Sequence, residues 1–195
     1  KGLNDSPEKL KQDIIKAGHN DSWDLAVDKL CNDGPELVKK ILIDKLNINF
    51  TQTKNKTDYE LTSEAAHSEQ RILYCNDTTG ESIQTNILGY LKKTKNIKIL
   101  TNHTAIDLLT LSHHSTNTKD IYKKPACFGI MTLNNLTGEV YPIYAKRTIL
   151  STGGIGQLYL HTTNSPESQG DGIAMAWRAG ARCFNLHYIQ FHPTA

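Results

Sequence analysis

Two glycine-containing segments in the C-terminal third of the chain restrict the possible folds most strongly. Arg147–Leu150 is apolar at its end, predicts a short buried strand, and runs directly into Ser151-Thr152-Gly153-Gly154. Further along, Gly170-Asp171-Gly172 precedes apolar residues at helical spacing and predicts the start of a helix. A strand, a glycine turn and a glycine-flanked helix start, in this order, indicate a mixed α/β (or α+β) fold.

The first part of the chain has the pattern of helices. Ser6-Pro7-Glu8 combines a capping hydroxyl, a proline suited to the first turn and an acid, and Gly18 predicts the end of that helix. A second helix is predicted after Ser22, with a buried stripe of Trp23, Ala26, Val27, Leu30 and Cys31. Asn32-Asp33-Gly34 is expected to end it, and Pro35 to open a third helix.

The pattern changes from about residue 70 to short strands mixed with helices. Strands are predicted at 71–74, 97–100, 104–111, 126–133, 139–145, 147–150 and 183–191. Residues 134–138 are rich in turn formers and predict a β-hairpin between their flanking strands. Further helices are expected at about 83–93 and after Asp171, and polar loops at 51–60 and 113–124.

Composition excludes several classes of protein. The chain has 195 residues and a net charge of +2, so it lacks the basic footprint of a nucleic-acid-binding protein. It contains no apolar run near the ~20 residues that span a bilayer, and no secretory leader is in view. Its four cysteines are far apart, which favours reduced thiols over disulfides or a metal site. We therefore expect a cytoplasmic protein without a nucleic-acid, membrane or metal partner.

Each candidate site residue has a structural and a functional interpretation. The backbone at Thr152-Gly153-Gly154 could form a simple turn after a strand, or admit a ligand close to the main chain. Asp171 could cap its helix, or accept a hydrogen bond from a cofactor hydroxyl. His192, stiffened by Pro193, could be structural, or could bind a substrate carboxylate. Glu64 alone reads as a solvated surface group, and only the residues around it, Leu61 to Ser68, suggest that it belongs to a site.

Together these segments resemble a known family from about residue 60 to the end of the chain. The family is that of L-aspartate oxidase, within the wider fumarate reductase and succinate dehydrogenase flavoproteins. The markers are Leu61-Thr62-x-Glu64-x-x-His67-Ser68, Arg71-Ile72-Leu73, Thr104-Ala105-x-Asp107-Leu108, Thr152-Gly153-Gly154, Thr162-Thr163-Asn164, the run 170–180 and Phe191-His192-Pro193-Thr194-Ala195. The Glu64 segment and the ending HPTA, in place of HPTG, are closer to aspartate oxidases.

The resemblance implies a fold and a domain organisation. The fold would be the Rossmann-like FAD-binding domain of these flavoproteins, without its N-terminal dinucleotide fingerprint. Residues 1–186 would be the central part of that domain, and residues 187–195 the start of the capping or substrate domain. We therefore expect an internal piece of a longer enzyme, inactive alone.

The resemblance also implies roles for individual residues. Glu64 would orient the substrate and sense its ammonium group, and His192 would bind a substrate carboxylate beside the flavin. Contacts with FAD would come from Thr104, Ala105, Thr152, Gly153, Gly154 and Asp171.

The implied reaction is the oxidation of L-aspartate to iminoaspartate, with FAD accepting the hydride and oxygen or fumarate acting as reoxidant. Iminoaspartate would then pass to quinolinate synthase in the route to NAD. An alternative is a fumarate reductase or succinate dehydrogenase flavoprotein subunit, whose dicarboxylate lacks the amine. A third is a non-catalytic fragment, since Ala65-Ala66 replaces two glycines of the relatives.

Overall fold

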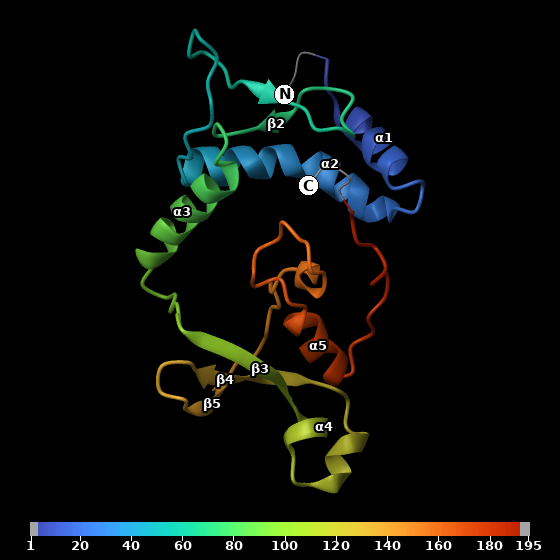
Figure 1. The fold of residues 1–195 in the computed structure, drawn as a ribbon, viewed down its shortest axis with the longest axis vertical. Coiled ribbons are helices and arrows are strands. Elements are labelled where there is room, and N and C mark those ends of the chain that lie inside the picture. The colour runs from blue at the N-terminus through green and yellow to red at the C-terminus, as the bar shows by residue number, and fades with distance from the viewer. Residues whose placement is uncertain (1–3, 192–195) are drawn as a thin grey trace. The chain divides into compact units, whose positions relative to one another are not determined.

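The structure is a computed structural model that describes residues 4–191 and contains two compact units (Figure 1). The first unit is Lys1–Ile99 and the second is Leu100–Ala195. Both contain helices and antiparallel strands, so the predicted mixture of helix and strand is confirmed. The predicted domain boundary between residues 186 and 187 concerns a longer protein and stays a prediction.

The first unit is mainly helical. Helix α1 (Pro7–Ala17) begins as predicted, because the Ser6 hydroxyl accepts a hydrogen bond from the Lys9 amide at 3.2 Å and proline fills the first position. Gly18 is its C-cap. Helix α3 (Thr79–Lys92) ends on a lysine as predicted, which is favourable at a helix C-terminus, but it begins four residues before the predicted start at about residue 83.

Helix α2 (Asp24–Leu37) contradicts the predicted break at residues 32–34. It contains both Gly34 and Pro35 and continues into the π-helical turn η1 (Val38–Lys45), as Figure 1 shows. Proline lacks an N–H donor and its ring crowds the carbonyl four residues earlier. The helix nevertheless continues, because the Val38 amide still donates to the carbonyls of Gly34 and Pro35. The predicted buried stripe is also narrower than expected: Val27 and Cys31 are buried, while Trp23 is 72% and Leu30 58% exposed.

A short hairpin completes the first unit. Strand β1 (Leu61–Thr62) pairs antiparallel with β2 (Ile72–Leu73), with Leu61 opposite Leu73. The core beside it is formed by Ile48, Phe50 and Cys75. The polar segment 51–60 is a loop, as predicted, with one isolated bridge between Gln52 and Tyr59.

The second unit is built on a three-stranded antiparallel sheet in the order β3-β4-β5. Its strands are β3 (His103–Thr110), β4 (Cys127–Asn134) and β5 (Val140–Tyr144), and the predicted hairpin joins the last two. Between β3 and β4 lie two short helical turns, α4 (Leu111–His114) and η2 (Thr118–Tyr122). The turn η3 (Gly156–Leu158) and helix α5 (Asp171–Arg178) follow the sheet.

Three predicted strands are absent from the described residues. Segments 97–100, 147–150 and 183–191 form no β-ladder, and apolar side chains in them are exposed to solvent, Ile149 to 87% and Phe184 to 79%. A strand exists only where a neighbour accepts its hydrogen bonds, and nothing within residues 4–191 pairs with them. Across the same residues no helix is long and apolar enough to cross a membrane.

Candidate functional site

Glu64 lies in the loop that joins β1 to β2, here called the Glu64 loop (residues 63–71). Its side chain is exposed. The loop begins with a closed turn, because the His67 amide donates to the Glu64 carbonyl at 2.9 Å and the Glu64 amide donates to Nδ1 of His67 at 3.4 Å. At the other end the Arg71 amide donates to the Thr62 carbonyl at 3.0 Å. The backbone on both sides of Glu64 is therefore fixed within the first unit.

One face of α1 and the residue preceding its cap hold the distal half of this loop. Arg71 donates to Asp5 through Nε and through a second nitrogen at 2.7 Å, and to Asp13 at 2.5 Å. Asp13 also accepts from the backbone amide and the hydroxyl of Ser68, each at 2.9 Å. The α1 anchor, as we call this set, is completed by an ion pair between Lys9 and Glu69 at 2.6 Å.

The α1 anchor perturbs the acidity of its members. The hydrogen bond from Arg71 lowers the pKa of Asp13 from 3.8 to about 2, and the Ser68 amide contributes further. The Arg71 hydrogen bond likewise lowers the pKa of Asp5, and the hydrogen bond to the Asp5 carboxylate raises the pKa of Arg71. The Arg71 side chain is only 8% exposed, and those of Asp5 and Asp13 are 11% and 12% exposed. All three groups are therefore charged and largely removed from water at neutral pH.

In the second unit the two predicted glycine segments lie against each other. Gly170 has φ +82°, and a Cβ there would contact Cγ2 of Ile155 at 2.7 Å. Gly172 is buried, and a Cβ on it would overlap the Thr152 side chain. Gly153 has φ +75° and lies against Ser168. The structure thus brings residues 152–155 onto residues 168–172, an arrangement that we call the glycine cradle.

Gly154 differs from the other glycines of the cradle. Its φ is outside the left-handed region, and among the described residues nothing lies within 4 Å of the position that a Cβ would take. Neither backbone conformation nor packing within residues 4–191 therefore requires glycine there. A bare backbone facing open space fits the close approach of a ligand.

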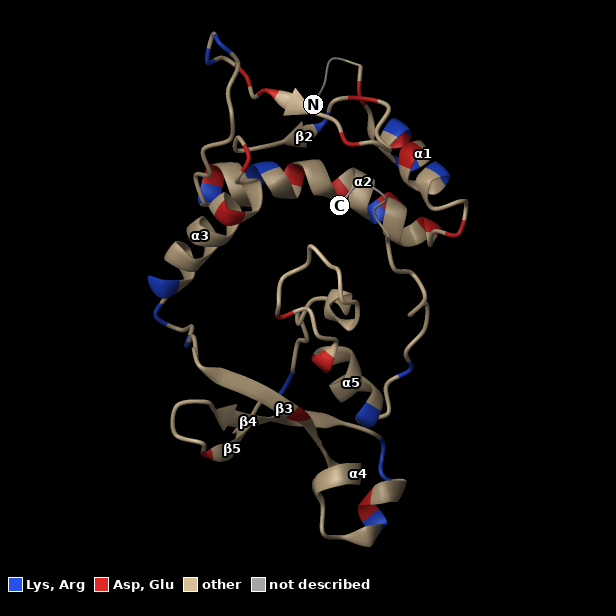
Figure 2. Cartoon of the chain, in the orientation of Figure 1, with Lys and Arg blue, Asp and Glu red and all other residues tan. Residues whose placement is uncertain are grey.

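Asp171 is the first residue of α5, and the prediction that it caps this helix is wrong. The N-cap is Gly170, in the left-handed conformation, and no side chain completes the cap. The sequence pattern failed because the glycine turn places the cap one residue earlier. The Asp171 side chain is exposed and, within the described part of the chain, accepts no hydrogen bond, so it is free to accept one from a ligand hydroxyl. Figure 2 shows an acidic residue at the start of α5 and a basic one at its end, the favourable order for a helix dipole.

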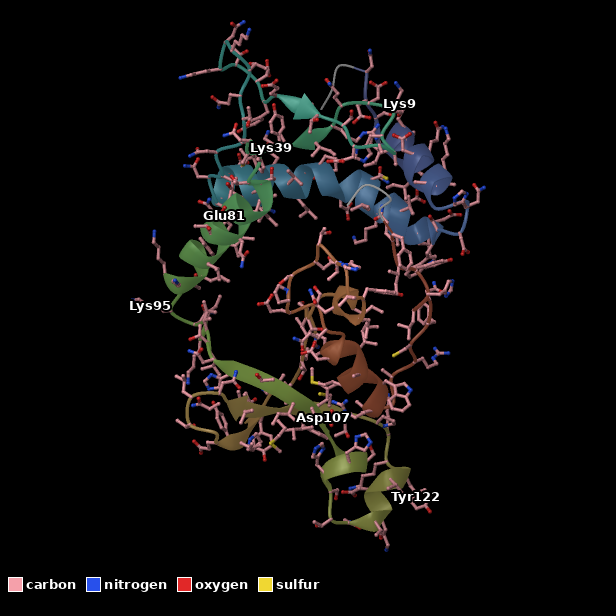
Figure 3. All side chains as sticks on the ribbon, in the orientation of Figure 1. Lys9, Lys39, Glu81, Lys95, Asp107 and Tyr122 are labelled. Carbon is pink, nitrogen blue, oxygen red and sulfur yellow. The ribbon has the colours of Figure 1, made fainter. Side chains whose placement is uncertain are left out.

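Thr104 and Ala105 lie on β3, just before an irregularity in its pairing with β4. Thr104 is exposed, and its hydroxyl exchanges hydrogen bonds with the Asn135 side-chain amide. Arg178, at the end of α5, donates to Asp107 at 3.1 Å and to the Ile106 carbonyl at 3.1 Å. Asp107 is labelled on β3 in Figure 3. This contact fixes α5 to the strand that carries Thr104 and Ala105.

The structure therefore brings together Thr152, Gly153, Gly154 and Asp171, and connects them through α5 to β3. Glu64 belongs to the first unit and is described there, and His192 lies outside the described residues. Sequence reasoning missed the supporting residues Asp13, Ser68 and Arg178. The local signal of the α1 anchor was the four-residue spacing of Asp5, Lys9 and Asp13, of which Lys9 and Asp13 share one face of α1 and Asp5 precedes its cap.

A comparison with protein families identifies the class of this fold and site. The FAD binding domain family matches residues 1–195, so the chain belongs to that family and its cofactor is FAD. The glycine cradle fits this cofactor, because the exposed Gly154 backbone and the Asp171 carboxylate offer the bare main chain and the acceptor that a nucleotide needs.

Individual relatives narrow the class. The chain is 37% identical to an L-aspartate oxidase of Halobacterium salinarum over 98% of its length and 36% of the relative's. It is 35% identical to L-aspartate oxidase 1 of Ralstonia nicotianae and 37% to chloroplastic L-aspartate oxidase 2-b of Nicotiana tabacum, again over 98% of the chain but 34% and 28% of those proteins. The chain thus spans about a third of the length of the curated relatives it matches.

Solved structures share the fold at lower sequence identity. FrdA of E. coli quinol fumarate reductase superposes with a TM-score of 0.80 at 18% identity, over 91% of this chain and 28% of FrdA. Mycobacterium smegmatis Sdh1 gives a TM-score of 0.74 at 20% identity, over 90% of this chain and 29% of Sdh1. The FAD-binding fold of the fumarate reductase and succinate dehydrogenase flavoproteins is therefore confirmed.

Proposed function

We propose that the full-length protein is an L-aspartate oxidase, which converts L-aspartate to iminoaspartate. The observation that carries the proposal is the 35–37% identity to L-aspartate oxidases along 98% of the chain, through both the Glu64 loop and the glycine cradle. Iminoaspartate is the substrate of quinolinate synthase, so we place the protein at the first step of NAD biosynthesis, in the cytoplasm.

The reaction removes two electrons and two protons from the substrate. A hydride leaves the α-carbon and a proton leaves the ammonium nitrogen, so that a C=N bond forms. When bound, FAD would supply the two-electron acceptor for this hydride, with oxygen or fumarate as the reoxidant. We assign the holding of FAD to Thr104, Ala105, Asp171 and the backbone of 152–154.

Substrate orientation is assigned to two side chains. The exposed carboxylate of Glu64 faces no cation of its own loop at hydrogen-bonding distance, so it can bind the substrate ammonium. His192 would bind a substrate carboxylate. Succinate has the carboxylates but no ammonium, and it therefore cannot use the Glu64 contact.

The test compares L-aspartate and succinate as substrates of the full-length protein, followed by oxygen consumption. We expect turnover of L-aspartate and little of succinate. Glu64→Gln should lower kcat/KM for L-aspartate by one to two decades, about 1.5–3 kcal/mol for a charge-assisted contact, and reduce fumarate reduction far less. Glu139→Gln, an exposed glutamate at the turn before β5, is the matched control and should change neither.

Two results would overturn this assignment. Faster turnover of succinate than of L-aspartate would make the protein a succinate dehydrogenase or fumarate reductase flavoprotein. Equal losses of L-aspartate oxidation and fumarate reduction in Glu64→Gln would mean that this carboxylate serves the fold or the flavin, and the ammonium contact would be withdrawn.

A further inference from the structure

We propose that the α1 anchor is a positioning device for Glu64, and that Asp13 and Arg71 therefore determine how well the protein discriminates L-aspartate from dicarboxylates without an amine. The inference rests on the proposed function, in which Glu64 binds the substrate ammonium. Asp13 and Arg71 are positioning residues that act through the Glu64 loop.

The first argument is the path of the backbone. The Asp13 carboxylate accepts a hydrogen bond from the Ser68 amide. Ser68 follows His67, and the His67 amide closes the turn by donating to the Glu64 carbonyl. On the other side, the Arg71 amide holds the Thr62 carbonyl, two residues before Glu64. Glu64 is thus the exposed side chain of a turn whose two ends are tied to a helix and to a hairpin.

The second argument is the chemistry of the contacts. Asp13 binds two residues of the loop, Ser68 through its amide and hydroxyl and Arg71 through its guanidinium, whereas Asp5 binds Arg71. Because the Asp13 carboxylate is largely buried, water competes little for these hydrogen bonds, and each of them is stronger than it would be on the surface. Removing its charge would leave Arg71 with Asp5 alone and weaken the hold on Ser68, while the Glu64 side chain itself stays intact.

The third argument is the place at which the ion pairs of the anchor meet this segment. Strands β1 and β2 already pair through Leu61 and Leu73. The additional ion pairs, Lys9 with Glu69 and Arg71 with both aspartates, all fall on residues 68–71 and none on the strands β1 and β2 themselves. They therefore tie the distal half of the loop to α1 and to the residue before its cap.

The experiment is a double-mutant cycle in the full-length protein with Asp13→Asn and Glu64→Gln. The asparagine side chain keeps an acceptor for the Ser68 amide but lacks the charge that fixes Arg71. We expect Asp13→Asn to lower kcat/KM for L-aspartate roughly tenfold, since small displacements of a positioned group cost about this much or more, and fumarate reduction much less. In the Glu64→Gln background, Asp13→Asn should leave kcat/KM for L-aspartate almost unchanged, because the residue through which Asp13 acts is already altered.

A readout independent of activity accompanies the cycle. Amide hydrogen exchange in residues 64–68 should become faster in Asp13→Asn, with or without FAD. The control is Asp28→Asn, which breaks the 2.6 Å ion pair between Asp28 of α2 and Lys11 of α1. This pair involves the same helix α1 but no residue of the Glu64 loop, so the control should leave both exchange and substrate discrimination unchanged.

The outcomes separate the two proposals. Unchanged exchange in residues 64–68, or additive losses in the cycle, would overturn the positioning role of Asp13. The same would follow if Asp28→Asn reproduced the effect, because the anchor would then act only through the stability of α1. If Glu64→Gln lowered L-aspartate oxidation and fumarate reduction equally, the ammonium contact of the proposed function would be withdrawn, while the exchange measurement would still decide whether the anchor fixes the loop.

Discussion

The glycines of the cradle are required for different physical reasons. Gly153 and Gly170 adopt positive φ, a conformation that costs other residues energy, and Gly172 is packed against Thr152. Gly154 has neither constraint among the described residues. Its role can therefore be separated experimentally from the roles of its neighbours.

We expect Gly154→Ala and Gly172→Ala to have opposite profiles. Gly154→Ala should change the free energy of unfolding without FAD by less than about 0.5 kcal/mol, since its methyl group meets no described protein atom. It should weaken FAD binding about tenfold, or about 1.4 kcal/mol, by crowding the cofactor. Gly172→Ala should instead destabilise the protein without FAD by about 1–3 kcal/mol through overpacking.

Chemical unfolding of the apoprotein and FAD titration by fluorescence check this pair. If Gly154→Ala binds FAD as tightly as the wild type, the bare backbone at that position does not face the cofactor, and the assignment of Gly154 to the FAD site is contradicted.

The site was only partly predictable from individual residues. The glycine segments were found because their composition carries a local backbone meaning. Asp171 was placed correctly at the start of α5 but with the wrong capping role, since the choice between Gly170 and Asp171 depends on the turn geometry. Arg71 and Asp13 were missed as a pair, because they are 58 positions apart and a long-range ion pair leaves no periodic pattern in the sequence.

At the scale of elements, helices with explicit start and end residues were predicted well. Ser6 and Pro7 fixed the start of α1, and Lys92 marked the end of α3. The prediction of a break inside α2 was wrong because Gly34 and Pro35 were taken as signals that end one helix and start another. The hydrogen bonds of the neighbouring turns are enough to continue the helix through them. The helix propensity of a single residue is a weak predictor, and the hydrogen bonds and packing of the surrounding helix can outweigh it.

The continuity of α2 leads to a stability prediction for Gly34→Ala. Gly34 is helical, and apart from its chain neighbours and its own helix backbone no described atom lies within 4 Å of its Cβ position, but in a helix the Cβ of a residue before proline meets Cδ of the proline ring. Because this contact offsets the gain in helix propensity, Gly34→Ala should change the free energy of unfolding by less than about 0.5 kcal/mol. Urea unfolding measures the change. Gly129→Ala is the control, because Gly129 has φ +143° and a Cβ would overlap the Ile143 carbonyl, so it should destabilise. A loss of more than about 1 kcal/mol in Gly34→Ala would favour a real helix break at that residue.

At the scale of the whole molecule, the main failure of prediction concerns strands without partners. Segments 97–100 and 147–150 have the apolar pattern of strands and exposed side chains, including Ile97 and Ile149. Pairing depends on neighbours distant in sequence, which an apolar pattern does not identify. The hairpin of β4 and β5 was predictable because its partners are adjacent and joined by a turn-rich segment.

In the full-length protein we expect these two segments to pair as strands, because large apolar side chains such as Ile149 rarely stay in water when a sheet can cover them. Amide hydrogen exchange of the full-length protein checks this. Protection of residues 97–100 and 147–150 comparable to that of β4 is the expected result. Exchange as fast as that of the exposed turn at 135–138 would show that they are loops.

The division of the chain between Ile99 and Leu100 has a consequence for its biosynthesis. Every contact of the α1 anchor, from Asp5 to Arg71, falls within the first unit. At about 5–20 residues per second, a ribosome needs roughly 5–20 s to add the second unit. The turn that carries Glu64 can therefore be shaped on the nascent chain before the glycine cradle has been translated.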